Sequence, residues 1–237
     1  MTKIVVLDAG HGGSDPGATG FGLREKDLTL DRVLAIKRKL ETEYKGVKVI
    51  LTRNSDTYPS LSQRARIANS AKADLFISDH KNAYNGQARG FETFTYSNAS
   101  TASRAYQNVI HREVYSRIKK YGIPDRGQKS ANYQVLRQTK MPAVLLEEAF
   151  IDNKKDNDLL RSSAFKNDYT EGVVVGIAKS LGLQKKEVSQ MNNKPSAWAK
   201  SSWEKATKAK VVDGTRPQEP VTREQLAVIL DRLGLIK

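Results

Sequence analysis

The first 183 residues alternate short apolar runs, of the length of a β-strand, with longer segments of helical periodicity. The expected strands are Ile4–Asp8, Val47–Thr52, Leu75–Asp79, Gly90–Tyr96, Tyr133–Leu136 and Ala143–Glu147. The expected helices are Asp27–Tyr44, Leu61–Ala71, Ala102–Tyr121, Asp156–Arg161 and Ala164–Leu181. Strands that alternate with helices favour an α/β domain, in which ligands gather beyond the carboxyl ends of the strands.

Two apolar runs have no polar interruption, Leu75–Ile77 and Val144–Leu146. Such runs are typical of central strands that are covered on both faces. The run Ile4–Leu7 near the N-terminus is too short for the apolar region of a signal peptide, and no small-residue cleavage site follows it. We therefore expect a buried strand there and no secretory signal. No segment reaches the roughly 18 apolar residues that a membrane span needs, so we expect no stable membrane insertion.

The composition changes after Leu183. Residues 184–195 are polar and charged and end in a proline, which is typical of a linker. Beyond them, Ser196–Lys208 has the pattern of a helix, with Trp198 and Trp203 on one side. A turn at Asp213–Pro217 leads to a second helix, Val221–Leu233. Its expected signals are Thr222 as N-cap, Gln225 in a capping box and Gly234 as terminator. Two helices bury little surface, so this module is expected to dock, to dimerise or to need further repeats.

Charge and cysteine content restrict the function. The formal net charge of +14 indicates a polyanionic partner or surrounding, and either nucleic acid or an anionic cell wall would satisfy it. The chain has no cysteine, which excludes disulfides, thiolate nucleophiles and thiolate metal sites. A metal ion would have to be held by histidine, aspartate or glutamate, and there are only three histidines, His11, His80 and His111.

Chemically active side chains stand at the ends of three expected strands. His11 follows the first strand in a glycine-rich loop, His80 follows the third, and Glu147 ends the last. Glu25 precedes the first long helix. Two neutral imidazoles and one carboxylate make an open zinc site with water as fourth ligand, and a further carboxylate is then needed to carry the proton.

Each of these residues also has a purely structural explanation. A histidine after a strand is commonly a hydrogen-bonded structural residue, and Glu25 would interact favourably with a helix dipole. Glu147 could be a salt-bridged strand end. His111 lies within the expected helix Ala102–Tyr121, where packing or solvent contact is its expected role.

The ordered motifs resemble those of the zinc-dependent N-acetylmuramoyl-L-alanine amidases found among sporulation enzymes and phage endolysins. The resemblance spans roughly residues 3–181 and rests on five blocks in order. These are Val6–Gly13 with Asp15–Ala18, then Glu25, Leu51–Arg53, Arg64–Asn69 leading through Ala73–Ser78 to His80–Ala83, and Pro142–Glu147 followed by Phe150–Asn153.

The resemblance implies a function and a site. His11, Glu25 and His80 fall on the zinc ligands of the family, and Glu147 falls on its catalytic glutamate. The implied fold is an α/β domain with a mixed, largely parallel sheet flanked by helices, here followed by a small C-terminal helical module. The implied reaction is hydrolysis of the amide between N-acetylmuramic acid and L-alanine. Peptidoglycan and anionic wall polymers, rather than nucleic acid, are then the expected partners.

Three residues depart from the family pattern. The family usually has an aliphatic residue at the position of Asp79 and a small one at that of Lys81. Strand alternation points Asp79 away from His80, which favours a supporting role or a salt bridge over zinc ligation. Glu148 should likewise face away from Glu147, and it is the alternative candidate for the base.

The tail, Trp198–Ala206 with Asp213–Pro217 and Val221–Gln225, resembles the helical wall-binding tails of Bacillus-type phage lysins. We therefore expect residues 1–183 to be a catalytic domain and 196–237 a wall-binding module, although a small appendage on the catalytic domain is the alternative. The chain is expected to act as a monomer. It should stay in the cytoplasm until the membrane is permeabilised, as an endolysin or a mother-cell lysis enzyme would. Another zinc peptidase or deacetylase, or a basic binding protein with a degenerate site, remains an alternative.

Overall fold

The computed structural model describes residues 2–186, 195–209, 211–212, 223–233 and 235. The chain divides into two compact units, Met1–Lys185 and Lys186–Lys237. The first unit extends slightly beyond residue 183. The Lys45 N–H donates to the carbonyl of Gln184 at 2.9 Å, and Lys185 forms a β-bridge with Tyr44. These two contacts hold the start of the expected linker against the first unit.

A six-stranded sheet forms the centre of the first unit, with the strand order β4-β1-β5-β8-β6-β7. The strands are β1 (Lys3–Ala9), β4 (Val47–Leu51), β5 (Leu75–Asn82), β6 (Phe91–Tyr96), β7 (Asp125–Ala131) and β8 (Ala143–Phe150). Only the β6–β8 pair is antiparallel, so the sheet is mixed and largely parallel as expected. A short hairpin, β2 (Thr19–Gly20) with β3 (Leu23–Arg24), stands apart from it.

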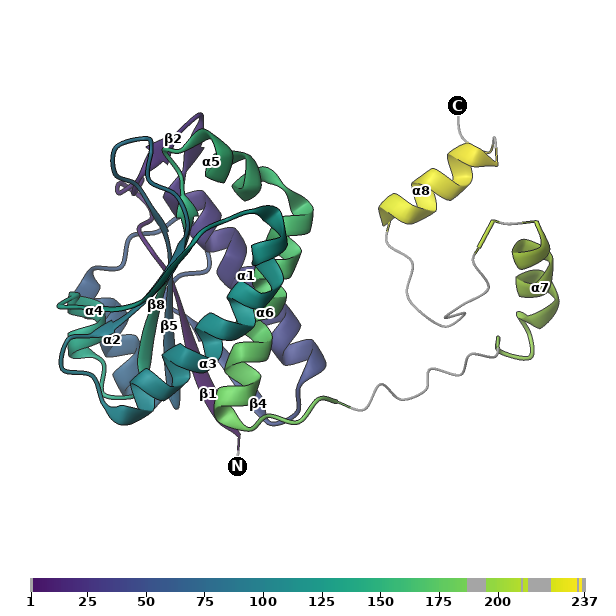
Figure 1. Ribbon diagram of the computed structural model, residues 1–237. Helices are drawn as coiled ribbons and strands as arrows, with labels where there is room; N and C mark the ends of the chain where they lie inside the picture. The colour runs from purple at the N-terminus through teal and green to yellow at the C-terminus, as the bar shows by residue number, and fades with distance from the viewer. Residues whose placement is uncertain (1, 187–194, 210, 213–222, 234, 236–237) are drawn as a thin grey trace. The chain divides into compact units, whose positions relative to one another are not determined.

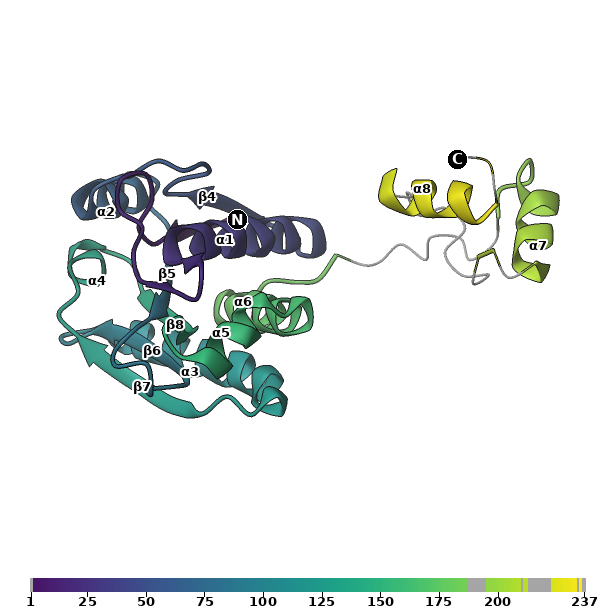
Figure 2. The same cartoon turned by 90° about the horizontal axis from the view of Figure 1, so that it is seen from above.

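Helices cover both faces of the sheet (Figures 1 and 2). They are α1 (Glu25–Glu43), α2 (Leu61–Ser70), α3 (Thr101–Ile118), α4 (Gln134–Gln138), α5 (Lys154–Arg161) and α6 (Ser163–Leu181), with a 3₁₀ turn at Lys119–Tyr121. The larger core joins one sheet face to α1, α3 and α6. The smaller core joins the other face to α2 and α4. The runs Leu75–Ile77 and Val144–Leu146 are buried throughout, which confirms their prediction as central strands.

The prediction of a strand at Tyr133–Leu136 is wrong. Tyr133 is the N-cap of helix α4, and Val135 and Leu136 pack from that helix into the smaller core. A short apolar run satisfies either a strand or one buried face of a helix, so its sequence did not separate the two.

Strand β7 was not predicted from the sequence. It is the last strand of the sheet, pairs only with β6, and has the sequence Asp-Arg-Gly-Gln-Lys-Ser-Ala. An edge strand with partly exposed faces can be polar, and charged residues such as lysine on an edge discourage pairing with other chains. A search for apolar periodicity therefore does not predict strand β7.

The remaining helices of the first unit lie where they were expected, with ends shifted by a few residues. The difference that matters for function concerns α1, which begins at Glu25 rather than at Asp27. Glu25 is therefore the first residue of the helix and not a loop residue before it. The N–H groups of Glu25 and Lys26 donate to the carbonyls of Ala18 and Pro16, which fixes the loop against the helix start.

The described residues of the second unit include two helices, α7 (Lys200–Lys208) and α8 (Arg223–Arg232). Helix α7 begins four residues later than expected, because residues 197–199 form a turn. The expected turn Asp213–Pro217, the cap Thr222 and the terminator Gly234 lie outside the described residues, as does the side chain of Gln225. Among the helices in the described part of the chain, none has the length and apolar character of a membrane span.

Candidate metal centre

Adjacent parallel strands bring three of the four candidate residues to one end of the sheet. His11 follows β1, His80 lies in β5, and Glu147 lies in β8 directly opposite His80 in the β5–β8 register. The chain enters β1 at the bottom of Figure 1, so these residues lie toward the end where β2 and α5 are labelled. Glu25 reaches the same place from the first residue of α1.

His11, Glu25 and His80 form a compact cluster, and their possible ligand atoms all lie within 4.8 Å of one another. The Glu25 carboxylate lies between the two rings. Its Oε2 is 3.1 Å from His11 Nε2 and its Oε1 is 2.9 Å from His80 Nδ1. The imidazole rings meet edge to face with centroids 5.0 Å apart. The three residues therefore direct two ring nitrogens and a carboxylate to a single point.

Two glycines provide the room for this cluster. A Cβ atom on Gly10 would overlap the His80 ring, and one on Gly17 would lie 2.7 Å from both Glu25 Oε2 and the His11 ring. Gly17 also has a φ of +65°, which glycine adopts without strain. His11 itself has a φ of 60°, an uncommon conformation for a residue with a side chain. The loop is therefore built to place the His11 ring at this point.

Hydrogen bonds hold the cluster from outside. Asp15 Oδ2 lies 2.8 Å from His11 Nδ1, which leaves Nε2 directed toward Glu25. The backbone N–H groups of Ala18 and Lys81 donate to the two oxygens of Glu25, at 2.8 and 2.9 Å. A carboxylate on the outer nitrogen of a histidine is a common feature of metal sites, because it fixes the orientation of the ring.

The electrostatics of the cluster favour a charged carboxylate. Burial raises the pKa of Glu25, but hydrogen bonds from His11 and His80 more than offset this, and the net pKa lies well below the ordinary value. For His11, burial lowers the pKa, and the carboxylates of Glu25 and Asp15 raise it to a net value above the ordinary one. The cluster thus holds a buried negative charge, which favours the binding of a cation.

Glu147 lies in a different environment from Glu25. Its Oε2 atom is buried and has no hydrogen-bond partner among the described residues. Burial, followed by the negative charges of Glu25 and Glu92, raises its pKa well above the ordinary value. Glu92 lies directly opposite Glu147 in the β6–β8 register. Two carboxylates at one site, one favoured as the anion and one as the acid, are typical of proton-transfer chemistry.

The residues that depart from the family pattern lie on the other face of the sheet. Lys81 forms ion pairs with Asp79 and Glu148, and Glu148 also pairs with Arg32 of α1 at 2.8 Å. Asp79 accepts a hydrogen bond from Tyr169 Oη at 2.8 Å. The sequence left a supporting role and a salt bridge open for Asp79, and the salt bridge is confirmed. Glu148, the alternative base, is directed away from the histidine cluster.

His111 has no part in the cluster. It is buried in α3, stacks on Phe91 with centroids 4.9 Å apart, and has Asp125 Oδ1 3.0 Å from its Nε2. It thereby ties α3 to the edge strand β7, which confirms the expected packing role.

Sequence reasoning assigned no role to Asp15 or to two buried arginines, Arg53 and Arg64. Both guanidinium groups donate to backbone carbonyls of the loop that carries His11. Asp15 stands four residues after His11 in the glycine-rich loop, and that spacing was the available signal. The sequence held no such signal for the arginines, because their partners are backbone atoms that a sequence pattern does not identify.

Comparison with known proteins agrees with this geometry. The sequence profile of the N-acetylmuramoyl-L-alanine amidase family matches residues 5–179. An endolysin of Bacillus phage SPP1 is 50% identical over 202 residues, which cover 83% of this chain and 74% of the endolysin. A sporulation-specific N-acetylmuramoyl-L-alanine amidase of Bacillus subtilis is 44% identical over 185 residues, covering 78% of this chain and 70% of the relative.

Solved structures show the same fold. The catalytic domain of CwlV, an N-acetylmuramoyl-L-alanine amidase from Bacillus (Paenibacillus) polymyxa, superposes with a TM-score of 0.72 at 35% identity, covering 77% of this chain and all of that domain. An N-acetylmuramoyl-L-alanine amidase from Clostridium difficile gives a TM-score of 0.73 at 32% identity, covering 76% of this chain and 97% of the other. The chain therefore belongs to the N-acetylmuramoyl-L-alanine amidases, hydrolases of peptidoglycan.

Proposed function

We propose that this amidase depends on zinc, with His11, Glu25 and His80 as the metal ligands and Glu147 as the general base. The observation that carries the proposal is the convergence of the three ligand residues, whose donor atoms lie within 4.8 Å of one another. Glu147 stands opposite one of those ligands on the neighbouring strand.

The donor set fits zinc. Two imidazole nitrogens and one carboxylate oxygen are the protein ligands of many catalytic zinc sites, which keep a fourth position open. The buried Oε2 of Glu147, which lacks a partner among the described residues, is an acceptor that a water molecule or the substrate would satisfy. A zinc ion bound here supplies Lewis acidity toward the amide carbonyl and lowers the pKa of a water molecule.

The protein residues then bind, orient and move protons. Glu147 accepts the proton of the attacking water at its carboxylate and delivers it to the departing nitrogen of L-alanine. Its raised pKa favours the first transfer, because burial and the charges of Glu25 and Glu92 destabilise its anion and so make it a stronger base. Glu25 stays ionised and in place through the N–H groups of Ala18 and Lys81.

Zinc content and product analysis test this function on the full chain. We expect about one zinc ion per purified chain, and release of L-alanine amino termini from peptidoglycan without new reducing sugars. His80→Ala should lose the metal and the activity together. Glu171→Gln, on α6 and paired with Lys39, is the matched control. New reducing ends, or new sugar amines without free L-alanine, would instead support another hydrolase.

We further propose that the enzyme lyses cell walls once the membrane has been opened, as a phage endolysin does. The support is the 50% identity to the endolysin of Bacillus phage SPP1. A role in mother-cell lysis is the second candidate, favoured by the 44% identity to the sporulation-specific amidase. Expression with and without a membrane-permeabilising agent tests the first: lysis should follow permeabilisation and not expression alone.

We also propose that residues 196–237 bind the cell wall. Trp198 is 90% exposed, and α7 carries exposed lysines at 200, 205 and 208. An exposed indole suits a sugar face, and lysines beside it suit an anionic polymer. All four candidate site residues come from one chain, which supports action as a monomer. Light scattering that gives the mass of a dimer would contradict that state.

A further inference from the structure

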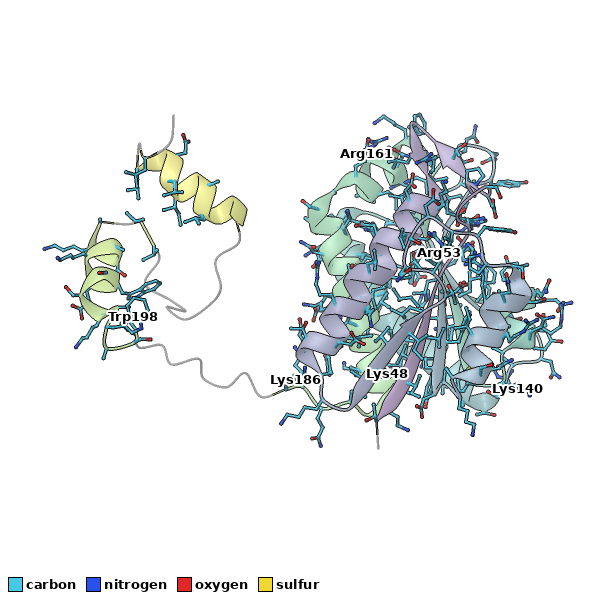
Figure 3. The ribbon with its side chains drawn as sticks, turned by 180° about the vertical axis from the view of Figure 1, so that it is seen from behind. Lys48, Arg53, Lys140, Arg161, Lys186 and Trp198 are labelled. Atoms are coloured by element: carbon cyan, nitrogen blue, oxygen red, sulfur yellow. The ribbon has the colours of Figure 1, made fainter. Side chains whose placement is uncertain are left out.

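Arg53 is a buried cation whose hydrogen-bond acceptors are all uncharged. It lies just after β4, near the carboxyl end of the sheet, and only 4% of it is exposed (Figure 3). Its guanidinium group donates to four carbonyls, those of Ala9, Gly10, Lys26 and Ser55, and to one hydroxyl, that of Thr29. Burying a charge whose direct partners are all neutral is costly, so this arrangement calls for an explanation beyond stability.

The acceptors of Arg53 belong to the two segments that supply metal ligands. Ala9 and Gly10 immediately precede His11, and their carbonyls accept at 3.0 Å. Lys26 immediately follows Glu25, and its carbonyl accepts from the same guanidinium at 2.7 Å. One rigid planar group therefore spans the loop of His11 and the first turn of α1.

Thr29 completes this connection. Its hydroxyl accepts from Arg53 at 3.0 Å and lies 2.8 Å from the Gly10 carbonyl, to which it donates. Thr29 is fully buried in α1. The Gly10 carbonyl is thus held by two donors, one from the strand end and one from the helix.

Arg64 of α2 fixes the far side of the same loop. It donates to the carbonyls of Ala9 and His11, and it also forms a buried ion pair with Asp8 at 2.8 Å. Three successive carbonyls, those of Ala9, Gly10 and His11, are therefore held by guanidinium groups. These bonds hold His11 at its φ of 60°. Unlike Arg64, Arg53 has no carboxylate among these partners, so substituting it does not leave a buried carboxylate without its ion-pair partner.

We propose that Arg53, assisted by Thr29, is a positioning residue that sets the placement of His11 relative to Glu25 and thereby the affinity for the metal ion. The inference rests on the zinc function proposed above. Lysine at this position would keep the charge but would lose the fork that reaches several acceptors at once. The carbonyls of Gly10 and Lys26 would then move apart, and the two ligands with them.

Zinc affinity and cobalt spectra of Arg53→Lys test this role. Competition with a chromophoric chelator should show zinc binding weaker by about 10–100-fold, the usual effect of losing a group that supports a ligand. The visible absorption bands of the Co²⁺-loaded variant should shift, because they report ligand geometry. Arg66→Lys is the matched control, since Arg66 is exposed on the helix of Arg64. It should match the unchanged chain in both measurements.

A second variant keeps the test decisive if Arg53→Lys does not fold. Thr29→Val removes the hydroxyl with almost no change in volume, and it should weaken zinc binding in the same direction. Unchanged affinity and an unchanged cobalt spectrum in a folded Arg53→Lys or Thr29→Val protein would overturn the inference. If the unchanged chain itself binds no zinc, the zinc function fails first, and the two failures are therefore distinguishable.

Discussion

Within one site, the pKa of Glu25 is lowered and the pKa of Glu147 is raised. Glu25 accepts hydrogen bonds from two backbone amides and faces two imidazoles. Glu147 is buried without such donors and faces the charge of Glu92 instead. Proximity of the two carboxylates reinforces the difference, because the charge of Glu25 opposes ionisation of Glu147.

Glu147→Gln should separate metal binding from turnover. Glutamine has nearly the same shape but neither accepts nor delivers a proton, so we expect kcat to fall by about 10²–10⁴-fold with zinc content unchanged. Metal analysis and single-turnover kinetics on peptidoglycan fragments measure the two effects. Retention of full activity would contradict the assignment of Glu147 as the base.

Gly10→Ala tests whether the space beside His80 is needed. The backbone of Gly10 does not have a positive φ, so the added methyl group acts through its overlap with the His80 ring alone. We expect the ring to be displaced and zinc affinity to fall by at least about tenfold. Calorimetric zinc titration measures the loss, and an affinity equal to that of the unchanged chain would show that the ring has other room.

At the scale of elements, an ion network joins β5 and β8 to the helices behind them. Lys81 lies between Asp79 and Glu148, and all three side chains are fully buried. Arg32 from α1 and Tyr169 from α6 complete it. The network sits behind the strand residues that face the cluster of His11, Glu25 and His80.

Loss of Lys81 alone should be costly, and loss of its partner charge should restore stability. Lys81→Met leaves two buried carboxylates opposite the single charge of Arg32, and we expect a loss of about 3–5 kcal/mol in the free energy of unfolding. In Asp79→Asn/Lys81→Met the charges balance again, and the amide oxygen still accepts from Tyr169. Urea unfolding should show the double variant to be more stable than the single one. The reverse order would contradict this account.

His111 makes the stability of the α3–β7 junction depend on pH. Burial lowers its pKa, although the charge of Asp125 raises it in part. The unfolded chain therefore binds a proton near pH 6.5 that the folded chain does not yet bind, and stability from this residue is lost as pH falls below that value. His111→Gln should show a shallower loss of unfolding free energy between about pH 7 and 5. The comparison isolates His111, since every other ionisable group is the same in both proteins.

The sequence identified most of the elements of the first unit, but not all, for a physical reason. Buried strands such as β8 carry apolar runs that no polar residue interrupts, here Val144–Leu146. The edge strand β7 is polar, and the short helix α4 contributes only two buried apolar side chains, Val135 and Leu136. Periodicity is strong only where an element buries a whole face.

At the scale of the whole molecule, the candidate site could be predicted because its residues follow from topology. His11 follows β1, and His80 and Glu147 lie in the neighbouring parallel strands β5 and β8, so the three meet at one end of the sheet without any knowledge of side-chain packing. The supporting residues Arg53 and Thr29 could not be predicted in this way. Their role depends on the position of backbone carbonyls, which only the folded chain defines.

The boundary between the two units sets the last prediction. A variant truncated after Lys185 tests this boundary, because Gln184 and Lys185 still contact the first unit. Because the candidate metal ligands and Glu147 lie wholly within residues 11–147, we expect the shortened chain to hydrolyse small muramoyl peptides at the rate of the full chain. Its binding to intact walls, measured by sedimentation, should be weaker, and more so at low salt where lysines contribute most.

The point variant Trp198→Ala in the full chain is the companion to that truncation. Removal of a single exposed indole leaves the charge of the tail unchanged, so a loss of wall binding would assign the contact to the sugar face rather than to the lysines. If truncation and Trp198→Ala both leave wall binding intact, the second unit is not a wall-binding module. The catalytic unit would then carry the attachment to the wall.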